Sequence, residues 1–319
     1  MNHHLLRALV LLTAAAFASA APAADKVRVG KAVPFAWTFT PIDVGIEAGI
    51  FAKHGLELTV TGFSGDARLQ QGLVSDSVDF GLGSGPGMGF LAKGVPAKAV
   101  AAMAGAPMNM SMVVSYDSPI KTLDDIKGKK VGITTVGSLT DWLLKRVASE
   151  KKWAPTDVTA VTVGGMDSTK AALKTGQIDA VVIALELGYA LEAAKEWRVL
   201  SLLAPFAPDF HTHVIFARDE LIAKKPDVVE RFLRGWFETI AFMRANKERT
   251  VEITAKVLNL DKAVISRVYD EQIKIFTADG RFDPKALVVI RQSLVEMGIL
   301  QQVPDDSVMF TTRFLPVRY

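Results

Sequence analysis

The segment GDARLQQGLVSDSVD at residues 65–79 is followed 100 residues later by a similar segment, GMDSTKAALKTGQID, at residues 165–179. The two align without a gap. Each contains a glycine turn, a helical run, a short turn and a Val-Asp or Ile-Asp pair that opens a strand. Two such units predict two related α/β lobes, although chance similarity between unrelated α/β units could also produce the match.

Strand-like and helical segments alternate around both copies. The apolar spacing predicts helices at 42–53, 67–73, 138–151 and 169–174, and a mainly helical chain beyond Pro226. β-branched and apolar runs predict strands at 27–29, 56–61, 78–82, 97–103, 130–134, 158–163, 180–183 and 198–203. This alternation predicts parallel strand pairing with helices on the faces of each sheet.

The composition is that of an ordinary globular protein. A length of 319 residues suggests about two domains. The 37 basic and 34 acidic side chains are interspersed, so the sequence predicts no nucleic-acid surface. The absence of cysteine excludes disulfides, thiolate metal sites and cysteine nucleophiles.

The first twenty residues have the pattern of a signal peptide. Arg7 precedes an apolar run at 8–18, and the segment ends in Ala18-Ser19-Ala20. We expect cleavage after residue 20, or alternatively after residue 23, and a mature protein in the periplasm. A buried N-terminal helix is the alternative. No later run approaches the ~18 apolar residues of a membrane span, and no cysteine follows that could carry a lipid anchor.

A glycine-rich loop at 81–87 resembles a phosphate loop but lacks the G-x-G-x-x-G spacing. It is also no nucleophile elbow, because Leu82 and Pro86 occupy the positions of the flanking glycines around Ser84. Either its backbone N–H groups, around Ser84 and Gly85, face a ligand, or the loop is a flexible connector.

Three further features involve polar side chains. His211 and His213 would share one face of a strand and could chelate a metal, but no third ligand is near, so a polar pair or a ligand hydrogen bond is favoured. Ser138 is placed to cap a helix, and its hydroxyl could also hold a ligand oxygen. Glu186 follows an apolar strand, where ligands usually bind in an open sheet; simple solvent exposure is the alternative.

Phe35, Trp37 and Phe39 crowd one loop between two prolines. A loop seldom exposes three aromatic side chains without a reason. They either cover the core or provide a stacking surface, and we expect stacking chiefly from Trp37.

The run PIDVGIEAGIFAKHGL at 41–56 resembles a helix of the periplasmic solute-binding proteins grouped with nitrate, sulfonate, taurine and thiamine-precursor binders, the NMT1/THI5-like family. Further segments agree in order and spacing: VDFG at 78–81, the D-x-K-G-K-x-V-G pattern within 123–132, Gly137-Ser138, and AALKTGQIDA at 171–180. The resemblance covers nearly the whole mature chain.

The resemblance implies a type II periplasmic-binding fold, with two α/β lobes joined by two crossover strands around a ligand cleft. Lobe 1 would combine residues 25–106 with 212–319, and lobe 2 would be residues 107–211. The crossovers would fall near 108–112 and 203–211, which are rich in proline or small residues.

The resemblance also implies a function. The protein would be a monomer that captures one small molecule without cofactor, metal or catalytic residue, and delivers it to an inner-membrane ABC permease driven by a cytoplasmic ATPase. Carried over position by position, the cleft loops of the family place the ligand-binding residues at Trp37, Thr38, Ser64, Gly65, Ser84, Gly85, Gly137, Ser138, Met166, Glu186 and His211.

These loops contain few basic side chains, which disfavours a small inorganic anion and favours a planar organic or N–H-bearing ligand. We expect Trp37 to stack on this ligand and Glu186 to accept a hydrogen bond from it. Two alternatives remain: a periplasmic sensing domain, and an enzyme. The resemblance extends to eukaryotic pyrimidine synthases, whose activity is associated with a cysteine-rich motif that this chain lacks.

Overall fold

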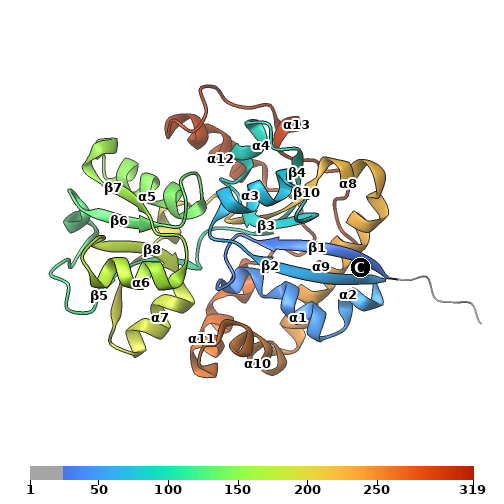
Figure 1. Ribbon diagram of the computed structural model, residues 1–319, viewed down its shortest axis with the longest axis horizontal. Coiled ribbons are helices and arrows are strands. Elements are labelled where there is room, and N and C mark those ends of the chain that lie inside the picture. The colour runs from blue at the N-terminus through green and yellow to red at the C-terminus, as the bar shows by residue number, and fades with distance from the viewer. Residues whose placement is uncertain (1–23) are drawn as a thin grey trace, which may run out of the picture.

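The computed structural model describes residues 24–319, so the predicted signal peptide lies outside the described residues. The chain forms two α/β lobes side by side, each built on a five-stranded sheet (Figure 1). None of the described helices is long and apolar enough to cross a membrane.

The sheet of lobe 1 has the strand order β2-β1-β3-β10-β4. β1 pairs in parallel with β2 and β3, whereas β10 runs antiparallel to both β3 and β4. The strands are β1 (Asp25–Lys31), β2 (Leu56–Gly62), β3 (Phe80–Ser84), β4 (Ala97–Ala104) and β10 (His213–Arg218).

The sheet of lobe 2 repeats this arrangement in the order β7-β6-β8-β5-β9. β6 is parallel to β7 and β8, and β5 is antiparallel to β8 and β9. The strands are β5 (Met110–Ser115), β6 (Lys130–Ile133), β7 (Thr159–Thr162), β8 (Ala180–Ala184) and β9 (Trp197–Leu202). The expected parallel pairing is therefore wrong for β5 and β10. Each is the first strand after the chain passes between lobes, and each enters its sheet against the direction of its neighbours.

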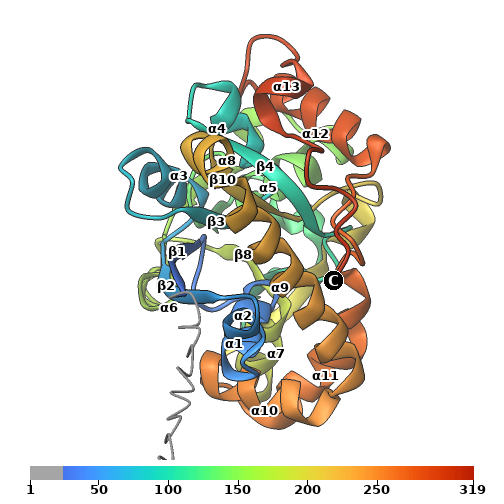
Figure 2. The ribbon, with the colours of Figure 1, turned by 90° about the vertical axis from the view of Figure 1, so that its right-hand side faces the viewer.

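Helices pack on the faces of both sheets, as expected for alternating elements (Figures 1 and 2). Lobe 2 carries α5 (Leu139–Glu150), α6 (Met166–Lys174) and α7 (Leu185–Ala193). Lobe 1 carries α1 (Pro41–Glu47), α2 (Ile50–Lys53), α3 (Asp66–Val74), α4 (Met88–Ala92), α8 (Asp219–Lys224), α9 (Pro226–Ala245), α10 (Lys247–Leu258), α11 (Lys262–Gln272), α12 (Pro284–Glu296) and α13 (Asp306–Met309).

The helix predicted at 42–53 is interrupted. Gly49 adopts a φ of +71°, which ends α1 and begins α2. In the core beside this turn, the ring of Phe232 stacks between those of Phe51 and Phe80, with centroid separations of 5.6 and 4.0 Å. This aromatic stack fixes α2 and α9 against the sheet of lobe 1.

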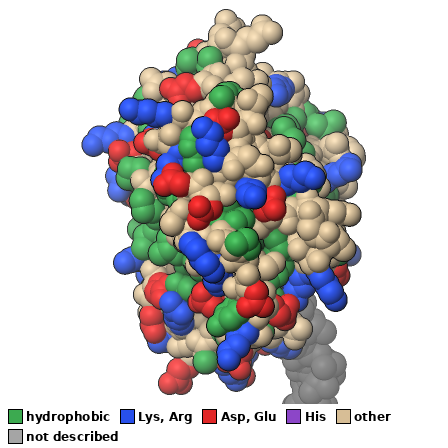
Figure 3. Space-filling model, turned by 90° about the vertical axis from the view of Figure 1, so that its left-hand side faces the viewer, with side chains coloured by type: hydrophobic (Ala, Val, Ile, Leu, Met, Phe, Trp, Pro, Cys, Tyr) green, Lys and Arg blue, Asp and Glu red, His purple; other side chains and the backbone are tan. Residues whose placement is uncertain are grey.

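Residues 105–109 and 203–212 carry the chain between the lobes. The first connects β4 to β5, and the second connects β9 to β10 through a short 3-10 turn at Ala204–Phe206. The exact lobe boundaries at residues 107 and 211 stay a prediction. On the outer face of lobe 2, basic and acidic side chains are intermingled (Figure 3).

Candidate functional site

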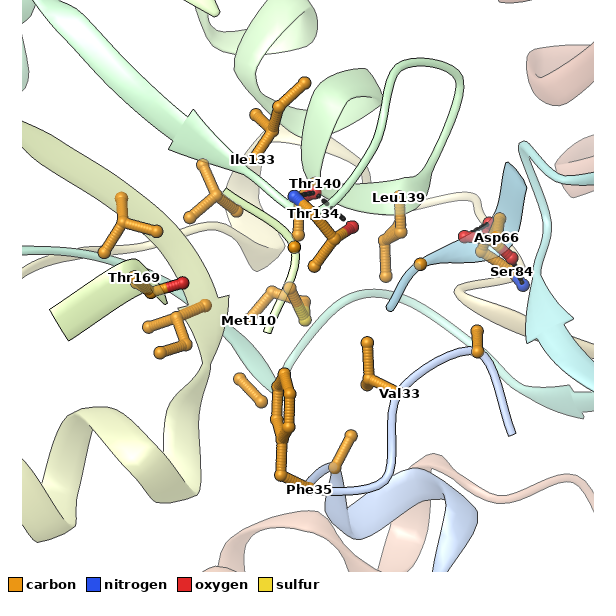
Figure 4. A pocket seen from close by; sticks show the side chains of 18 of the residues that line it. Val33, Phe35, Asp66, Ser84, Met110, Ile133, Thr134, Leu139, Thr140 and Thr169 are labelled. Atoms are coloured by element: carbon orange, nitrogen blue, oxygen red, sulfur yellow. Dashed lines mark hydrogen bonds between the residues drawn. The ribbon is translucent and has the colours of Figure 1, made fainter. Parts of the chain in front are cut away.

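A cavity of about 60 Å³ lies between the lobes, where the carboxyl ends of β1 and β3 face those of β6 and β8. This volume exceeds the roughly 10–15 Å³ that a cavity needs to hold one water. The wall is mainly apolar (Figure 4). Its polar side chains are Asp66, Ser84 and His213 of lobe 1, Asn109 of the first connection, and Thr134, Thr140 and Thr169 of lobe 2.

Asp66, at the start of α3, is 3% exposed and accepts hydrogen bonds from the N–H and hydroxyl of Ser84 at 2.8 and 3.0 Å. Desolvation by burial raises its pKa, while the Ser84 groups and the backbone N–H of Leu139 oppose that rise. Leu139 is the first residue of α5, so the carboxylate of one lobe faces the helix N-terminus of the other.

Three hydroxyls form a closed cluster on the lobe 2 side. The Thr134 hydroxyl lies 2.9 Å from that of Ser138 and 3.0 Å from that of Thr140, and the Ser138 and Thr140 hydroxyls are 2.9 Å apart. The N–H of Thr134 also donates to the Thr140 hydroxyl at 2.9 Å. Thr134 and Thr140 line the cavity, whereas the buried Ser138 supports them from behind.

Two cavity-lining side chains next to the interlobe connections have unsatisfied polar atoms. Asn109 Oδ1 and His213 Nδ1 are buried without a hydrogen-bond partner among the described residues. His213 Nε2 lies 3.3 Å from the Thr38 hydroxyl. Burial lowers the pKa of His213 to about 3, so its imidazole is neutral at physiological pH.

Of the residues predicted to bind the ligand, Gly65, Ser84 and Met166 line the cavity. Gly65 has a φ of +117°, and a Cβ there would lie 2.6 Å from the Thr135 hydroxyl of lobe 2. Thr38 and Ser138 do not line the cavity, but each is hydrogen-bonded to a residue that does: Thr38 to His213, and Ser138 to Thr134. Ser64 lies beside Gly164 of the wall, and Gly137 packs against Phe90 outside it.

Trp37, which the sequence predicts to stack on the ligand, does not line the cavity. Its ring is fully buried in lobe 1, with centroids 6.1 Å from those of Tyr269 and Phe276. The 3-10 turn at Trp37–Phe39 directs this side chain into the core and leaves Phe35 on the cavity wall. Phe35 and Phe39 are therefore the phenylalanines that line the cavity, and Figure 4 labels Phe35 among the lining residues.

Glu186 is also placed differently from either expectation, because it neither lines the cavity nor meets solvent. It is the second residue of α7, and its Oε1 accepts a 2.6 Å hydrogen bond from the backbone N–H of Trp37 in lobe 1. Burial raises the pKa of Glu186 to about 7. Its Oε2 has no partner among the described residues. The carboxyl therefore joins the two lobes.

The glycine-rich loop does not present bare N–H groups to the cavity. The N–H of Gly85 donates to the Thr212 carbonyl at 3.0 Å, and that of Gly87 donates to the Ser84 carbonyl at 3.0 Å. A Cβ at Gly85 would lie 2.0 Å from the His211 carbonyl oxygen. Glycine at this position therefore permits close backbone packing.

His211 does not line the cavity, and its Nε2 accepts a 2.8 Å hydrogen bond from the N–H of Asp283. Its ring and that of His213 thus have different surroundings. Among residues 24–319, no group of three His, Cys, Asp or Glu side chains is arranged to hold a metal ion.

Further contacts join the lobes around the cavity. The Tyr189 hydroxyl of α7 donates to Glu271 of α11 at 2.8 Å, and the Arg267 guanidinium lies 3.6 Å from the centroid of the Tyr189 ring. On the opposite side, the Trp142 indole N–H of α5 donates to the Ser293 hydroxyl of α12 at 2.7 Å. Non-covalent contacts thus join the two lobes on both sides of the cavity, as in a closed cleft.

Sequence reasoning missed Asn109 and the Thr134/Thr140 pair as lining residues. Thr134 and Thr140 flank the predicted Gly137-Ser138 turn, so a wider window around that turn would have included them. Asn109 has a weaker signal: it is a polar residue between two methionines in an expected crossover.

The family model described as NMT1/THI5 like matches residues 37–250. A protein of Brucella abortus (strain 2308), provisionally named a binding protein, is 33% identical over 258 residues, covering 80% of this chain and 77% of that protein. A Bacillus subtilis (strain 168) protein, provisionally named an aliphatic sulfonates-binding protein, is 22% identical over 300 residues, covering 88% and 90%.

Solved structures show the same fold. The alkanesulfonate-binding protein SsuA from Xanthomonas axonopodis pv. citri, bound to MOPS, matches with a TM-score of 0.77 at 17% identity, covering 89% of this chain and 96% of that one. The desulfurization enzyme DszB matches with a TM-score of 0.63 at 17% identity, covering 91% and 97%. The predicted periplasmic-binding fold is confirmed. The match over two thirds of the sequence, together with the Brucella relative, shows that this chain belongs to the NMT1/THI5-like family.

Proposed function

We propose that this protein is the exported substrate-binding component of an ABC importer. It captures a small organic molecule in the interlobe cavity and delivers it to an inner-membrane permease with a cytoplasmic ATPase. The relatives named as binding proteins support a solute-binding role and a periplasmic location. The cavity carries the proposal, since both lobes line it and their facing surfaces are held together by hydrogen bonds and packing.

Such a cavity suits reversible capture. A ligand that contacts both walls stabilises the closed arrangement by its differential affinity for the closed and open forms. The aromatic face of Phe35, the sulfur atoms of Met110 and Met166, and the threonine hydroxyls provide apolar contact with a few orienting polar groups. This wall suits a molecule with a flat apolar part and a small polar edge.

Thermal-shift screening of the mature protein against sulfonates, oxyanions, pyrimidines and aromatic acids tests the proposal. A ligand present at a hundredfold excess over Kd stabilises the folded protein by roughly 2.7 kcal/mol, which is readily measured. Small-angle scattering would then report whether the ligand favours the compact form. No response to any class would contradict a binding function.

A cavity-filling variant provides the control. Ala184 lines the cavity at the end of β8, and Ala184→Phe would place a ring in the ligand space. Ala193→Phe puts the same ring on an exposed position of α7. We expect the first variant to lose binding and the second to retain it.

The fold match to DszB makes an enzyme the second candidate. Incubation of the protein with each bound ligand, followed by chromatography of the recovered ligand, separates the two functions, because a transport component returns the ligand unchanged. A sensing role is separated by an uptake assay, since deletion of the gene would abolish import of the ligand only if the protein serves a permease.

A further inference from the structure

The charge of the cavity wall is unusual for a site that would hold an anion. Among the described residues that line it, Asp66 is the only acid, and neither lysine nor arginine is present. The one lining histidine, His213, is kept neutral by burial. An anionic ligand would therefore be taken out of water with no cationic side chain to replace its hydration.

Helix N-termini can bind anions without a cationic side chain, because their unpaired N–H groups and aligned peptide dipoles attract negative charge. Here the chain places an acidic side chain of its own at this position. Asp66 lies in the first turn of α3 and faces the N-terminus of α5. Burial raises its pKa, and the groups of Ser84 and the first N–H of α5, that of Leu139, oppose this rise. Ser84 holds the carboxylate in place through its N–H and its hydroxyl. The helix ends of both lobes thus face a resident carboxylate.

The remaining polar atoms favour a ligand that donates hydrogen bonds. Asn109 Oδ1 is a buried acceptor without a partner among the described residues, and His213 Nδ1 is a second unpartnered ring atom on the same wall. An unsatisfied buried acceptor costs free energy until a donor reaches it. A ligand N–H or O–H group near the interlobe connections would supply that donor.

We infer that Asp66 is a specificity-determining residue, which makes the interlobe cavity select uncharged or cationic ligands with N–H or O–H donors and reject sulfonates and other anions. The inference rests on the proposed binding function and defines its ligand class. It also separates this chain from the relatives whose names refer to sulfonates.

Three probes of nearly identical shape test it: benzoate, benzamide and benzamidinium carry charges of −1, 0 and +1 on the same planar frame. Calorimetric titration of the wild-type protein should show benzamide and benzamidinium binding at least tenfold more tightly than benzoate. Native mass spectrometry of the protein as purified should show any retained small molecule to be neutral or cationic.

Asp66→Asn keeps the size of the side chain and an oxygen that can accept from Ser84, but it cannot ionise. It should reduce the preference for benzamidinium over benzoate at least tenfold. Asp167→Asn is the matched control, because Asp167 lies in the first turn of α6, the corresponding helix of lobe 2, and is exposed away from the cavity wall. This control should leave the preference unchanged within twofold.

The outcomes separate the inference from the function it rests on. Benzoate binding as tight as benzamide binding, or a retained sulfonate, would overturn the inference and leave the binding function intact. If no probe binds, the charge of the molecule retained in the mass spectrum decides: an anion overturns the inference and a neutral or cationic molecule supports it. No bound probe and no retained molecule would contradict the binding function, and the inference with it.

Discussion

The carboxyl group of Glu186 in lobe 2 accepts a 2.6 Å hydrogen bond from the backbone N–H of Trp37 in lobe 1. Tyr189, three residues later on the same face of α7, makes the second contact of this helix with lobe 1 through Glu271. α7 is therefore the element of lobe 2 that holds the cleft closed on the side of α11. One of its contacts is a carboxyl group that accepts from a backbone N–H, and the other is a phenol hydroxyl that donates to a carboxylate.

Replacement of Glu186 by Gln should change the pH dependence of stability. The pKa of Glu186 is about 7 in the closed protein, against 4.5 for an exposed carboxyl, so the closed form holds a proton that the unfolded chain releases between these values. Stability from this group is full below pH 4.5 and falls as pH rises through 7. The loss by pH 8 is on the order of 3 kcal/mol.

Urea unfolding at pH 5 and pH 8 checks this expectation. The neutral His213 contributes the opposite trend, because its pKa is lowered to about 3 and stability is lost as pH falls below 6.5. The comparison of wild type with Glu186→Gln removes this shared contribution. The variant should gain stability relative to wild type as pH rises, whereas Glu57→Gln on exposed β2 should not. Parallel profiles for Glu186→Gln and wild type would contradict the assignment.

Tyr189→Phe should weaken ligand binding without altering the cavity wall. The variant loses the 2.8 Å hydrogen bond to Glu271 but keeps the ring under the Arg267 guanidinium. Loss of a hydrogen bond to a charged group costs about 1.5–3 kcal/mol, so we expect affinity to fall tenfold or more and small-angle scattering to show a larger unliganded particle. Tyr116→Phe on the exposed surface of lobe 2 is the control and should behave as wild type.

Phe35→Ala and Trp37→Ala should differ in which property they damage. Phe35 lies on the cavity wall and is partly exposed, so its loss should reduce affinity at least tenfold and stability little. Trp37 is fully buried between aromatic rings, so its truncation should cost about 3–5 kcal/mol of unfolding free energy. Calorimetric titration and urea unfolding of both variants measure this. A Trp37→Ala protein that is stable but has lost affinity would contradict this assignment and indicate that Trp37 stacks on the ligand.

Gly65→Ala should hinder closure. The new Cβ would lie 2.6 Å from the Thr135 Oγ1 and 2.7 Å from its Cγ2 across the cleft, at a φ of +117° that alanine rarely adopts. We expect at least a tenfold loss of affinity, part of which Thr135→Ala should restore in the double variant. Gly165→Ala, at the matching position of the repeat, meets no atom within 4 Å and should bind normally. Equal effects at both glycines would exclude a steric cause.

The repeat predicted both lobes because local patterns determine its elements. Residues 66–74 and 166–174 form the corresponding helices α3 and α6, and each is followed by a buried strand, β3 or β8. β5 was not predicted as a strand, since the sequence marks Met108–Met112 only as a crossover. Its pairing with β8 and β9 depends on long-range contacts that no local pattern contains.

The site was predicted less well for a similar reason. Gly65, Ser84 and Met166 line the cavity because they terminate or follow elements whose ends meet in this fold. Trp37 and Phe35 lie two residues apart in one loop, and only the 3-10 turn decides which ring enters the core. The partner of Glu186 is the Trp37 N–H of the other lobe, 149 residues away. No local pattern reveals this contact, so the sequence alone suggests a carboxylate that is free to bind a ligand.

The strand order has a consequence for biosynthesis. The sheet of lobe 2 is assembled from one continuous segment, Met110–Leu202, whereas β4 of lobe 1 ends at Ala104 and its neighbour β10 begins only at His213. Until the whole of lobe 2 has been synthesised, β3 therefore lacks one of its two partners and β4 lacks its only strand partner. Contacts of such high sequence separation form slowly. We expect the second lobe to acquire its structure before the first, which leaves the chain before residue 105 without a completed sheet for the longest time.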